Sequence, residues 1–155
     1  MKLGVTEFLG VMLTALVTGV FWGTWFTLTR SLENFPPAEF IHIGKTIIAN
    51  VAMPMRFIMP FTLLIMLLAI WQCFRVHKTS FYLHQFSFLL MVITLIITVG
   101  IEVPIDNQIK TWTENTLPGN WQKLRQTWDA FHTLRTFTSI ASLAFFSLGI
   151  ISRRK

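Results

Sequence analysis

Four residues near the C-terminal end of the chain could act on one small molecule, because their spacing places them on the same side of a helix. Arg125, Trp128, His132 and Arg135 are separated by three, four and three positions, and residues at such separations are neighbours on a helical surface. A histidine can take or give a proton near neutral pH. The arginines could stabilise an anionic charge, and the tryptophan could stack on a ring. This face is therefore a candidate for proton transfer, with a purely structural histidine as the plainer interpretation.

The chain around this face is too apolar for a soluble domain. Of its 155 residues, 53% are hydrophobic and 13% are charged, against about 25% charged in soluble domains. The charges leave four uncharged runs of 17 to 23 residues, and a helix needs about 20 apolar residues to cross the hydrocarbon. We predict one all-α domain over residues 1–155. It is an integral membrane four-helix bundle with spans at about 8–29, 53–74, 80–101 and 132–152.

Lysines and arginines near the helix ends predict the orientation of the bundle. Lys2, Arg75, Lys78 and the Arg153–Lys155 tail lie on one side, where Glu7 is the only acid. On the other side, the basic residues are nearly balanced by acids. We therefore expect both termini in the cytoplasm and the protein in a bacterial inner (plasma) membrane.

The two connections on the outer, extracytoplasmic side are long and have helical character of their own. Pro36–Pro37 starts a helix that we expect to end before Pro54, since proline suits a first helical turn. The second connection breaks at Pro104. Asn120 is a candidate N-cap, and no breaker follows it for almost thirty residues. The fourth helix is therefore expected to begin near Trp121, well outside the membrane.

Several ionisable side chains should converge at the outer end of the bundle. The second and fourth uncharged runs are too short to span alone, so Arg56 and Arg135 should lie near the outer boundary. Arg30 ends the first helix and Glu102 ends the third at the same level. Ionisable groups at membrane depth are costly and often functional. The alternative is a structural ion-pair cluster, with arginines reaching lipid phosphates. Five of the six tryptophans, including Trp112, also lie on this side, as an aromatic belt or a pocket lining.

No metal or cofactor site is predicted from the histidines and the single cysteine, Cys73. Neither pair of histidines has a recognised ligand spacing, and a haem between His42 and His132 is a lesser alternative. Nothing supports nucleic-acid binding. Gly19-x-x-x-Gly23 would let another helix approach closely. We expect this motif to pack inside the bundle, with a homodimer through the same glycines as the alternative.

The segment that joins the third helix to the fourth resembles a known family. The residues that carry the resemblance are Glu102-Val-Pro-Ile-Asp-Asn107, Trp112, Leu117-Pro118, Trp121 and Arg125-x-x-Trp128-x-x-x-His132-x-x-Arg135-Thr136. This pattern is similar to that of the anthrone-oxygenase-like family of small membrane proteins with four transmembrane helices. By position, the family signature falls on Pro104, Asn107, Trp128, His132, Arg135 and Thr136. Family members often have asparagine where this chain has His132.

Some fungal members of that family are associated with the oxidation of anthrones to anthraquinones by molecular oxygen. The resemblance implies a similar oxygenase without a cofactor, whose partners are membrane lipids and a hydrophobic, aromatic or quinone-like molecule. His132 would remove a proton from an acidic C–H, an arginine would stabilise the enolate, and Asn107 would orient it. The candidate catalytic residues are His132, Arg135 and Asn107, and the candidate substrate-binding residues are Trp128, Arg125, Arg56, Glu102, Arg30 and Trp112. The alternative function is a non-enzymatic accessory protein that binds lipid or a partner.

Overall fold

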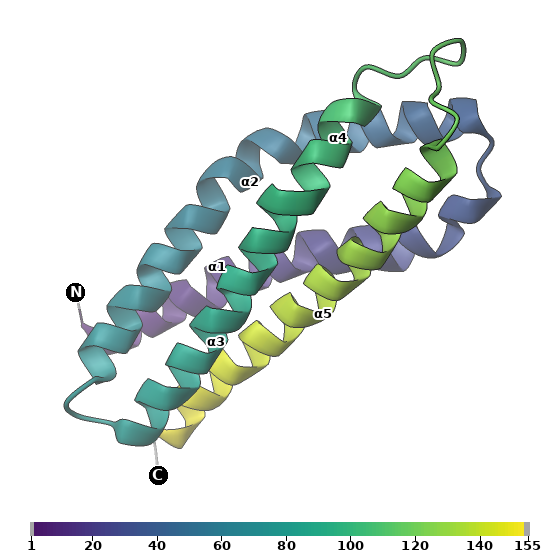
Figure 1. The fold of residues 1–155 in the computed structure, drawn as a ribbon. Helices are drawn as coiled ribbons and strands as arrows, with labels where there is room; N and C mark the ends of the chain where they lie inside the picture. The colour runs from purple at the N-terminus through teal and green to yellow at the C-terminus, as the bar shows by residue number, and fades with distance from the viewer. Residues whose placement is uncertain (1, 154–155) are drawn as a thin grey trace.

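The computed structural model describes residues 2–153, and every regular element in this range is a helix. The elements are α1 (Leu3–Thr27), the 3-10 turn η1 (Thr29–Asn34), α2 (Pro37–Cys73), α3 (Lys78–Ile97), the π-helical turn η2 (Thr98–Glu102), α4 (Val103–Ile109) and α5 (Trp121–Ser152). The long helices α1, α2, α3 and α5 run alternately up and down, so both ends of the chain lie at one end of the bundle (Figure 1). Arg154 and Lys155, two of the residues behind the predicted orientation, lie outside the described range.

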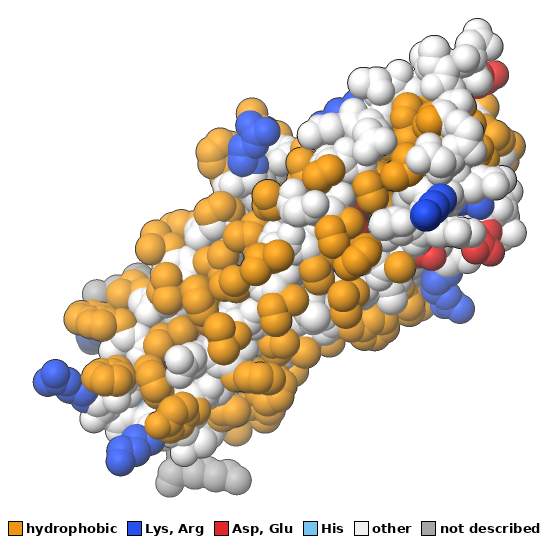
Figure 2. Space-filling view, in the orientation of Figure 1, with side chains coloured by type: hydrophobic (Ala, Val, Ile, Leu, Met, Phe, Trp, Pro, Cys, Tyr) orange, Lys and Arg blue, Asp and Glu red, His pale blue; other side chains and the backbone are white. Residues whose placement is uncertain are grey.

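The four-helix membrane fold predicted from the uncharged runs is confirmed. Within the described residues, four helical segments are long and apolar enough to cross a bilayer. Large hydrophobic side chains point outward from them: Trp71 is 73% exposed, and Phe57 is 66% exposed. Figure 2 shows hydrophobic side chains as a band over the lower and middle part of the molecule, with basic residues at both ends and acidic residues toward the upper end. Such an apolar surface belongs in lipid.

Small polar side chains hold the helices together inside the bundle. Ser87 on α3 and Ser142 on α5 each donate a hydrogen bond to the other's backbone carbonyl, at 2.6 and 2.8 Å. One turn or two further out, the hydroxyls of Thr94 and Thr138 lie 2.9 Å apart. Lipid tails are as apolar as leucine, so close packing and hydrogen bonds of this kind, rather than a hydrophobic driving force, hold membrane helices together.

The Gly19-x-x-x-Gly23 motif does not pack inside the bundle, contrary to expectation. A Cβ added at Gly19 or Gly23 would meet no atom within 4 Å. The close approach occurs instead at Gly149 on α5, where an added Cβ would lie 2.6 Å from Cδ2 of His84. Spacing alone cannot show which face of a helix is turned inward. The homodimer through Gly19 and Gly23 stays a prediction.

Prolines interrupt the helices less than the sequence suggests. The predicted end of a helix before Pro54 is wrong, since α2 runs through both Pro54 and Pro60. Each proline removes one backbone hydrogen bond, and membrane helices tolerate this where neighbouring helices and local adjustments compensate. The break predicted at Pro104 is absent as well, since α3, η2 and α4 follow one another without a gap from Lys78 to Ile109. The fourth long helix does begin at Trp121, directly after Asn120.

Candidate functional site

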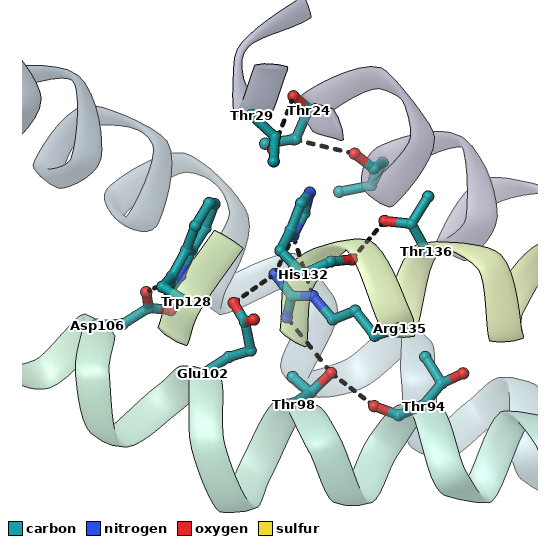
Figure 3. A network of polar contacts seen from close by, with 11 residues as sticks. Thr24, Thr29, Thr94, Thr98, Glu102, Asp106, Trp128, His132, Arg135 and Thr136 are labelled. Atoms are coloured by element: carbon teal, nitrogen blue, oxygen red, sulfur yellow. Dashed lines mark hydrogen bonds and ion pairs between the residues drawn. The ribbon is translucent and has the colours of Figure 1, made fainter. Parts of the chain in front are cut away.

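The third membrane helix changes its hydrogen-bonding pattern near the end of the bundle opposite the chain termini, which is the end called outer whatever its orientation in the membrane. Residues Thr98–Glu102 form a π-helical turn between α3 and α4. Such turns are rare and frequently lie at functional sites. Glu102 is the buried residue of this turn, with no exposed surface. Its carboxylate points toward α5 (Figure 3).

The guanidinium of Arg135 joins Glu102 to His132. Its Nη2 lies 3.0 Å from Oε2 of Glu102. The same guanidinium reaches Nδ1 of His132, at 3.1 Å from Nε and 2.8 Å from Nη2. Its Nη1 donates to Oγ1 of Thr98 at 3.4 Å, and its Cζ lies 4.6 Å from the centre of the Phe21 ring. A buried acid, a buried cation and a buried imidazole therefore form one connected cluster, as Figure 3 shows.

The imidazole of His132 is held between aromatic rings. Trp128 stacks on it, with ring centres 4.7 Å apart and planes 4° from parallel. Phe21 of α1 approaches it edge-on, with ring centres 6.4 Å apart. Trp128 is fixed in turn, because its Nε1 donates to Oδ1 of Asp106 on α4 at 3.1 Å. The orientation of His132 is thus determined by α1, α4 and its own helix.

These contacts decide where a neutral His132 carries its proton. A guanidinium only donates hydrogen bonds, so Nδ1 of His132 is the acceptor. The proton of the neutral ring must then be on Nε2. Nε2 is buried and makes no side-chain hydrogen bond with the described residues, and the backbone of Phe21 interacts with the ring. A ligand that approaches the ring would compete with this backbone contact for the Nε2–H donor.

A small apolar cavity lies on the outer side of this cluster. Its volume is about 30 Å³, and its walls include Trp128 and Asp106, Leu32 of η1, and Phe40 and Ile48 of α2. A space of this size holds about two water molecules. Sites for drug-sized ligands are typically about 300–1,000 Å³. In this conformation the cluster has little free space beside it.

Comparison with known proteins places this site in a family. The anthrone oxygenase family model matches residues 46–145, which extend from α2 into the inner part of α5. The chain belongs to the anthrone oxygenase family. The matched segment contains Glu102, Trp128, His132 and Arg135, whereas Phe21 and the rest of α1 lie outside it. No curated protein and no solved structure matched the chain.

Two of the predicted site residues are buried in the outer part of this anthrone oxygenase family member, beyond the cluster. Nη1 of Arg125 donates to the backbone carbonyl of Leu32 at 3.0 Å, and its Cζ lies 5.0 Å from the centre of the Trp121 ring. Trp112 is 5% exposed and packs among the apolar residues that close this end, Leu32 and Phe40 among them. Arg125 thus attaches η1 to α5, and Trp112 anchors the second outer connection.

Three other predicted site residues are exposed, so the structure does not bring them to His132. Arg56 lies on the outward side of α2. Arg30 is exposed as well and lies over the Trp25 ring at 6.0 Å. Asn107 is also exposed, and its Oδ1 accepts a hydrogen bond from Lys110 at 3.0 Å. His42, the other member of the haem alternative, is exposed on α2.

Sequence reasoning missed three residues that the structure adds to the site. Asp106 fixes Trp128, Thr98 accepts from Arg135, and Phe21 covers both the guanidinium and the imidazole. The sequence could have indicated Asp106, since this residue follows Glu102 by four positions and shares a helical face with it. Phe21 is one of fifteen phenylalanines and had none.

Proposed function

We propose that this protein is a membrane oxygenase that oxidises an anthrone-like aromatic ketone with molecular oxygen and without a cofactor. Family membership supports the reaction class. The observation that carries the proposal is the buried Glu102–Arg135–His132 cluster, which lies within the matched segment. In the overall reaction, a CH₂ group opposite the ketone becomes a second carbonyl. One oxygen atom of O₂ enters the product, and the other leaves as water with the two hydrogens.

The first step is the removal of a proton from the CH₂ group, which moves negative charge onto the ketone oxygen. The carboxylate of Glu102 is the base that the geometry favours, because Nδ1 of His132 already accepts from Arg135. The Nε2–H of His132 then donates to the ketone oxygen as its charge develops, which is the role of an oxyanion-hole donor. This assignment replaces the general-base role expected for His132 from the sequence. Arg135 orients both groups.

The second step transfers electrons to oxygen. The carbanion gives two electrons to O₂ and forms a C–O bond, and the resulting peroxide takes up one proton. The O–O bond then breaks as the remaining hydrogen leaves the carbon, which releases water and forms the new carbonyl. Glu102 serves in every proton transfer, since it can return the first proton to the peroxide, accept the second from the carbon and pass it to the departing hydroxide, which becomes water. No separate reductant is needed, because the substrate supplies all the electrons.

The substrate must make room for itself at the outer end of the bundle. The cavity beside Trp128 is about 30 Å³, so a tricyclic molecule enters only if the cap moves. η1 is the short element over this cavity, and the hydrogen bond from Arg125 to Leu32 is one of its attachments. We propose that η1 moves outward on binding and that the substrate stacks on Trp128 in place of the displaced apolar side chains.

The test is oxygen uptake and anthraquinone formation by the purified protein in mild detergent, with a hydroxyanthrone and the uncatalysed autoxidation rate as background. Glu102→Gln should lower kcat by about 10²–10⁴-fold, the usual contribution of a general base. Glu39→Gln changes an exposed glutamate of α2 and is the matched control. The proposal is wrong if the wild-type protein does not exceed the background, or if folded Glu102→Gln keeps the full rate.

Two substitutions of His132 test whether its imidazole acts as a hydrogen-bond donor or as the base. His132→Asn keeps an N–H donor but cannot accept a proton near neutral pH, so it should retain much of the activity. His132→Ala removes the donor and should lose about 10²–10³-fold in kcat. If His132→Asn is as inactive as His132→Ala while both remain folded, His132 is the base and the assignment to Glu102 fails. His42→Gln, at an exposed position, is the control.

The small size of the cavity favours one other function, that of a non-enzymatic accessory protein binding lipid or a partner. Mass analysis of what co-purifies in mild detergent distinguishes the two. A bound polyketide or quinone supports the oxygenase. Phospholipid alone, together with no activity above background, supports the accessory protein.

A further inference from the structure

A second group of ionisable side chains is buried at the opposite end of the bundle, where the chain termini lie. Glu7 comes from α1, Cys73 from α2 and His84 from α3, and their exposed fractions are 1%, 0% and 0%. Arg153, directly after α5, approaches from the rim, and its Nη2 lies 2.6 Å from Oε2 of Glu7. The oxygenase proposal uses none of these four residues.

The distances within this group match those around a single metal ion. Sγ of Cys73 and Nδ1 of His84 lie 3.7 Å apart. One ligand atom from each of Glu7, Cys73 and His84 lies within 4.8 Å of the other two. A tetrahedral zinc ion with a sulfur ligand at about 2.3 Å and a nitrogen ligand at about 2.0–2.1 Å holds those two atoms about 3.6 Å apart. A small inward movement of the carboxylate would complete the set.

The ring of His84 is held in the orientation that such a site needs. Its centre lies 4.5 Å from that of the Phe146 ring. Gly149 leaves room for it, since a Cβ there would lie 2.6 Å from Cδ2 and 2.7 Å from Nε2. Packing against α5 therefore turns Nδ1 toward Cys73. A contact between the ring and the backbone of Phe146 on α5 supports the same orientation.

We propose that Glu7, Cys73 and His84 bind one Zn²⁺ ion at the inner end of the bundle. A thiolate, an imidazole and a carboxylate form a mixed sulfur, nitrogen and oxygen ligand set that suits zinc. On binding, the Cys73 thiol loses its proton, and the two anionic ligands then neutralise the ion. With the paired Arg153 included, the group carries one net positive charge, which lies at the partly exposed rim of the bundle. The fourth position is left for water.

The site lies where three of the long helices come together at this end of the bundle. One ion would link α1, α2 and α3, and the Glu7–Arg153 ion pair would connect them to the end of α5. The role that follows is structural: the ion would fasten the inner end of the bundle, far from the Glu102 cluster. This inference does not depend on the proposed oxygenase activity.

The first test measures zinc bound to the full-length protein in mild detergent. The protein is stripped with a chelator, equilibrated with ZnCl₂, separated from free metal and analysed by mass spectrometry for zinc. About one Zn²⁺ per chain is expected, with tetrahedral coordination typical of protein zinc sites. Cys73→Ser and His84→Gln should lose it, whereas His77→Gln, at the less buried position before α3, should keep it. Equal zinc in wild type, Cys73→Ser and His84→Gln would overturn the proposal.

The second test needs no variant and so does not depend on the folding of one. Co²⁺ replaces zinc in the wild-type protein, and a thiolate ligand produces an intense sulfur-to-cobalt charge-transfer band. Cys73 is the only cysteine in the chain, so the band would report on this position alone. If Co²⁺ or Zn²⁺ does not bind, or if Co²⁺ binds without the band, Cys73 is not a ligand and the site is refuted.

Discussion

Replacing Glu102 by glutamine should destabilise the bundle strongly, because it leaves the charge of Arg135 buried. At 3.0 Å, two unit charges attract each other by about 5–6 kcal/mol at an effective dielectric constant of 20. Breaking one side of a buried pair typically costs about 3–5 kcal/mol. Glutamine keeps an oxygen acceptor, and Nδ1 of His132 still accepts from the guanidinium. We therefore expect a loss near the lower end of that range, at about 3 kcal/mol.

A double-mutant cycle isolates the contribution of the ion pair from the other contacts of Arg135. Arg135→Met also removes the hydrogen bonds to His132 and Thr98, so it should cost more than Glu102→Gln, at about 4–5 kcal/mol. The double variant has neither charge, so its loss should be smaller than the sum of the two single losses by about 1–3 kcal/mol.

The free energy of unfolding would be measured by titrating the purified protein with dodecyl sulfate in mixed micelles and following helix content by circular dichroism. Glu39→Gln, at an exposed position, is the control and should change stability by less than about 0.5 kcal/mol. Additive losses in the cycle, or a loss for Glu102→Gln no larger than that of the control, would show that Glu102 and Arg135 do not form a buried pair in the folded protein.

Three further predictions follow from the packing and the charge distribution. Gly149→Ala should lower the free energy of unfolding by about 1–3 kcal/mol, since its methyl group collides with His84. Gly19→Ala, with open space around the added Cβ, should leave it unchanged or raise it in the same titration. Ser87→Ala should cost about 0.6–2 kcal/mol, because the hydrogen bond from the Ser87 hydroxyl to the Ser142 carbonyl is lost while the one that Ser142 donates to the backbone of residue 87 remains. A reporter enzyme that works only in the cytoplasm should be active when fused to either terminus, and one that works only in the periplasm should be inactive. Activity of the periplasmic reporter would contradict the predicted orientation.

The membrane helices could be predicted from the sequence because a bilayer imposes a length and a composition on them. The runs without charge locate all four, and the start of α5 at Trp121 follows from the absence of breakers after Asn120. The continuity of α2 through Pro54 and Pro60 could not be predicted in the same way. The effect of a proline depends on whether neighbouring helices support the altered turn, and single-sequence patterns do not contain that information.

The sequence predicted how far along the bundle the charged residues lie, but not which side of its helix each residue faces. The lengths of the uncharged runs place Arg56 and Arg135 at a similar level. In the structure, however, Arg135 points inward and Arg56 points outward. The stripe of positions on α5 identified Trp128, His132 and Arg135 correctly as a shared face, because they belong to one helix.

Contacts between helices were beyond the reach of the sequence patterns. Glu7 is far from Cys73 and His84 in the chain, and no recognised ligand spacing connects the three residues. Only the packing of three helices brings them together.

The π-helical turn η2 determines the directions in which the side chains of α4 point. A π turn contains one residue more than an α turn, and one residue corresponds to about 100° of rotation. α4 is therefore turned by that angle relative to an uninterrupted continuation of α3. This rotation directs Ile105 and Ile109 into the outer apolar cluster and Asp106 toward Trp128. Deleting the exposed Gly100 would rotate all three away without altering any of their side chains. The position of these α4 side chains therefore depends on the number of residues that precede α4 as well as on the side chains themselves.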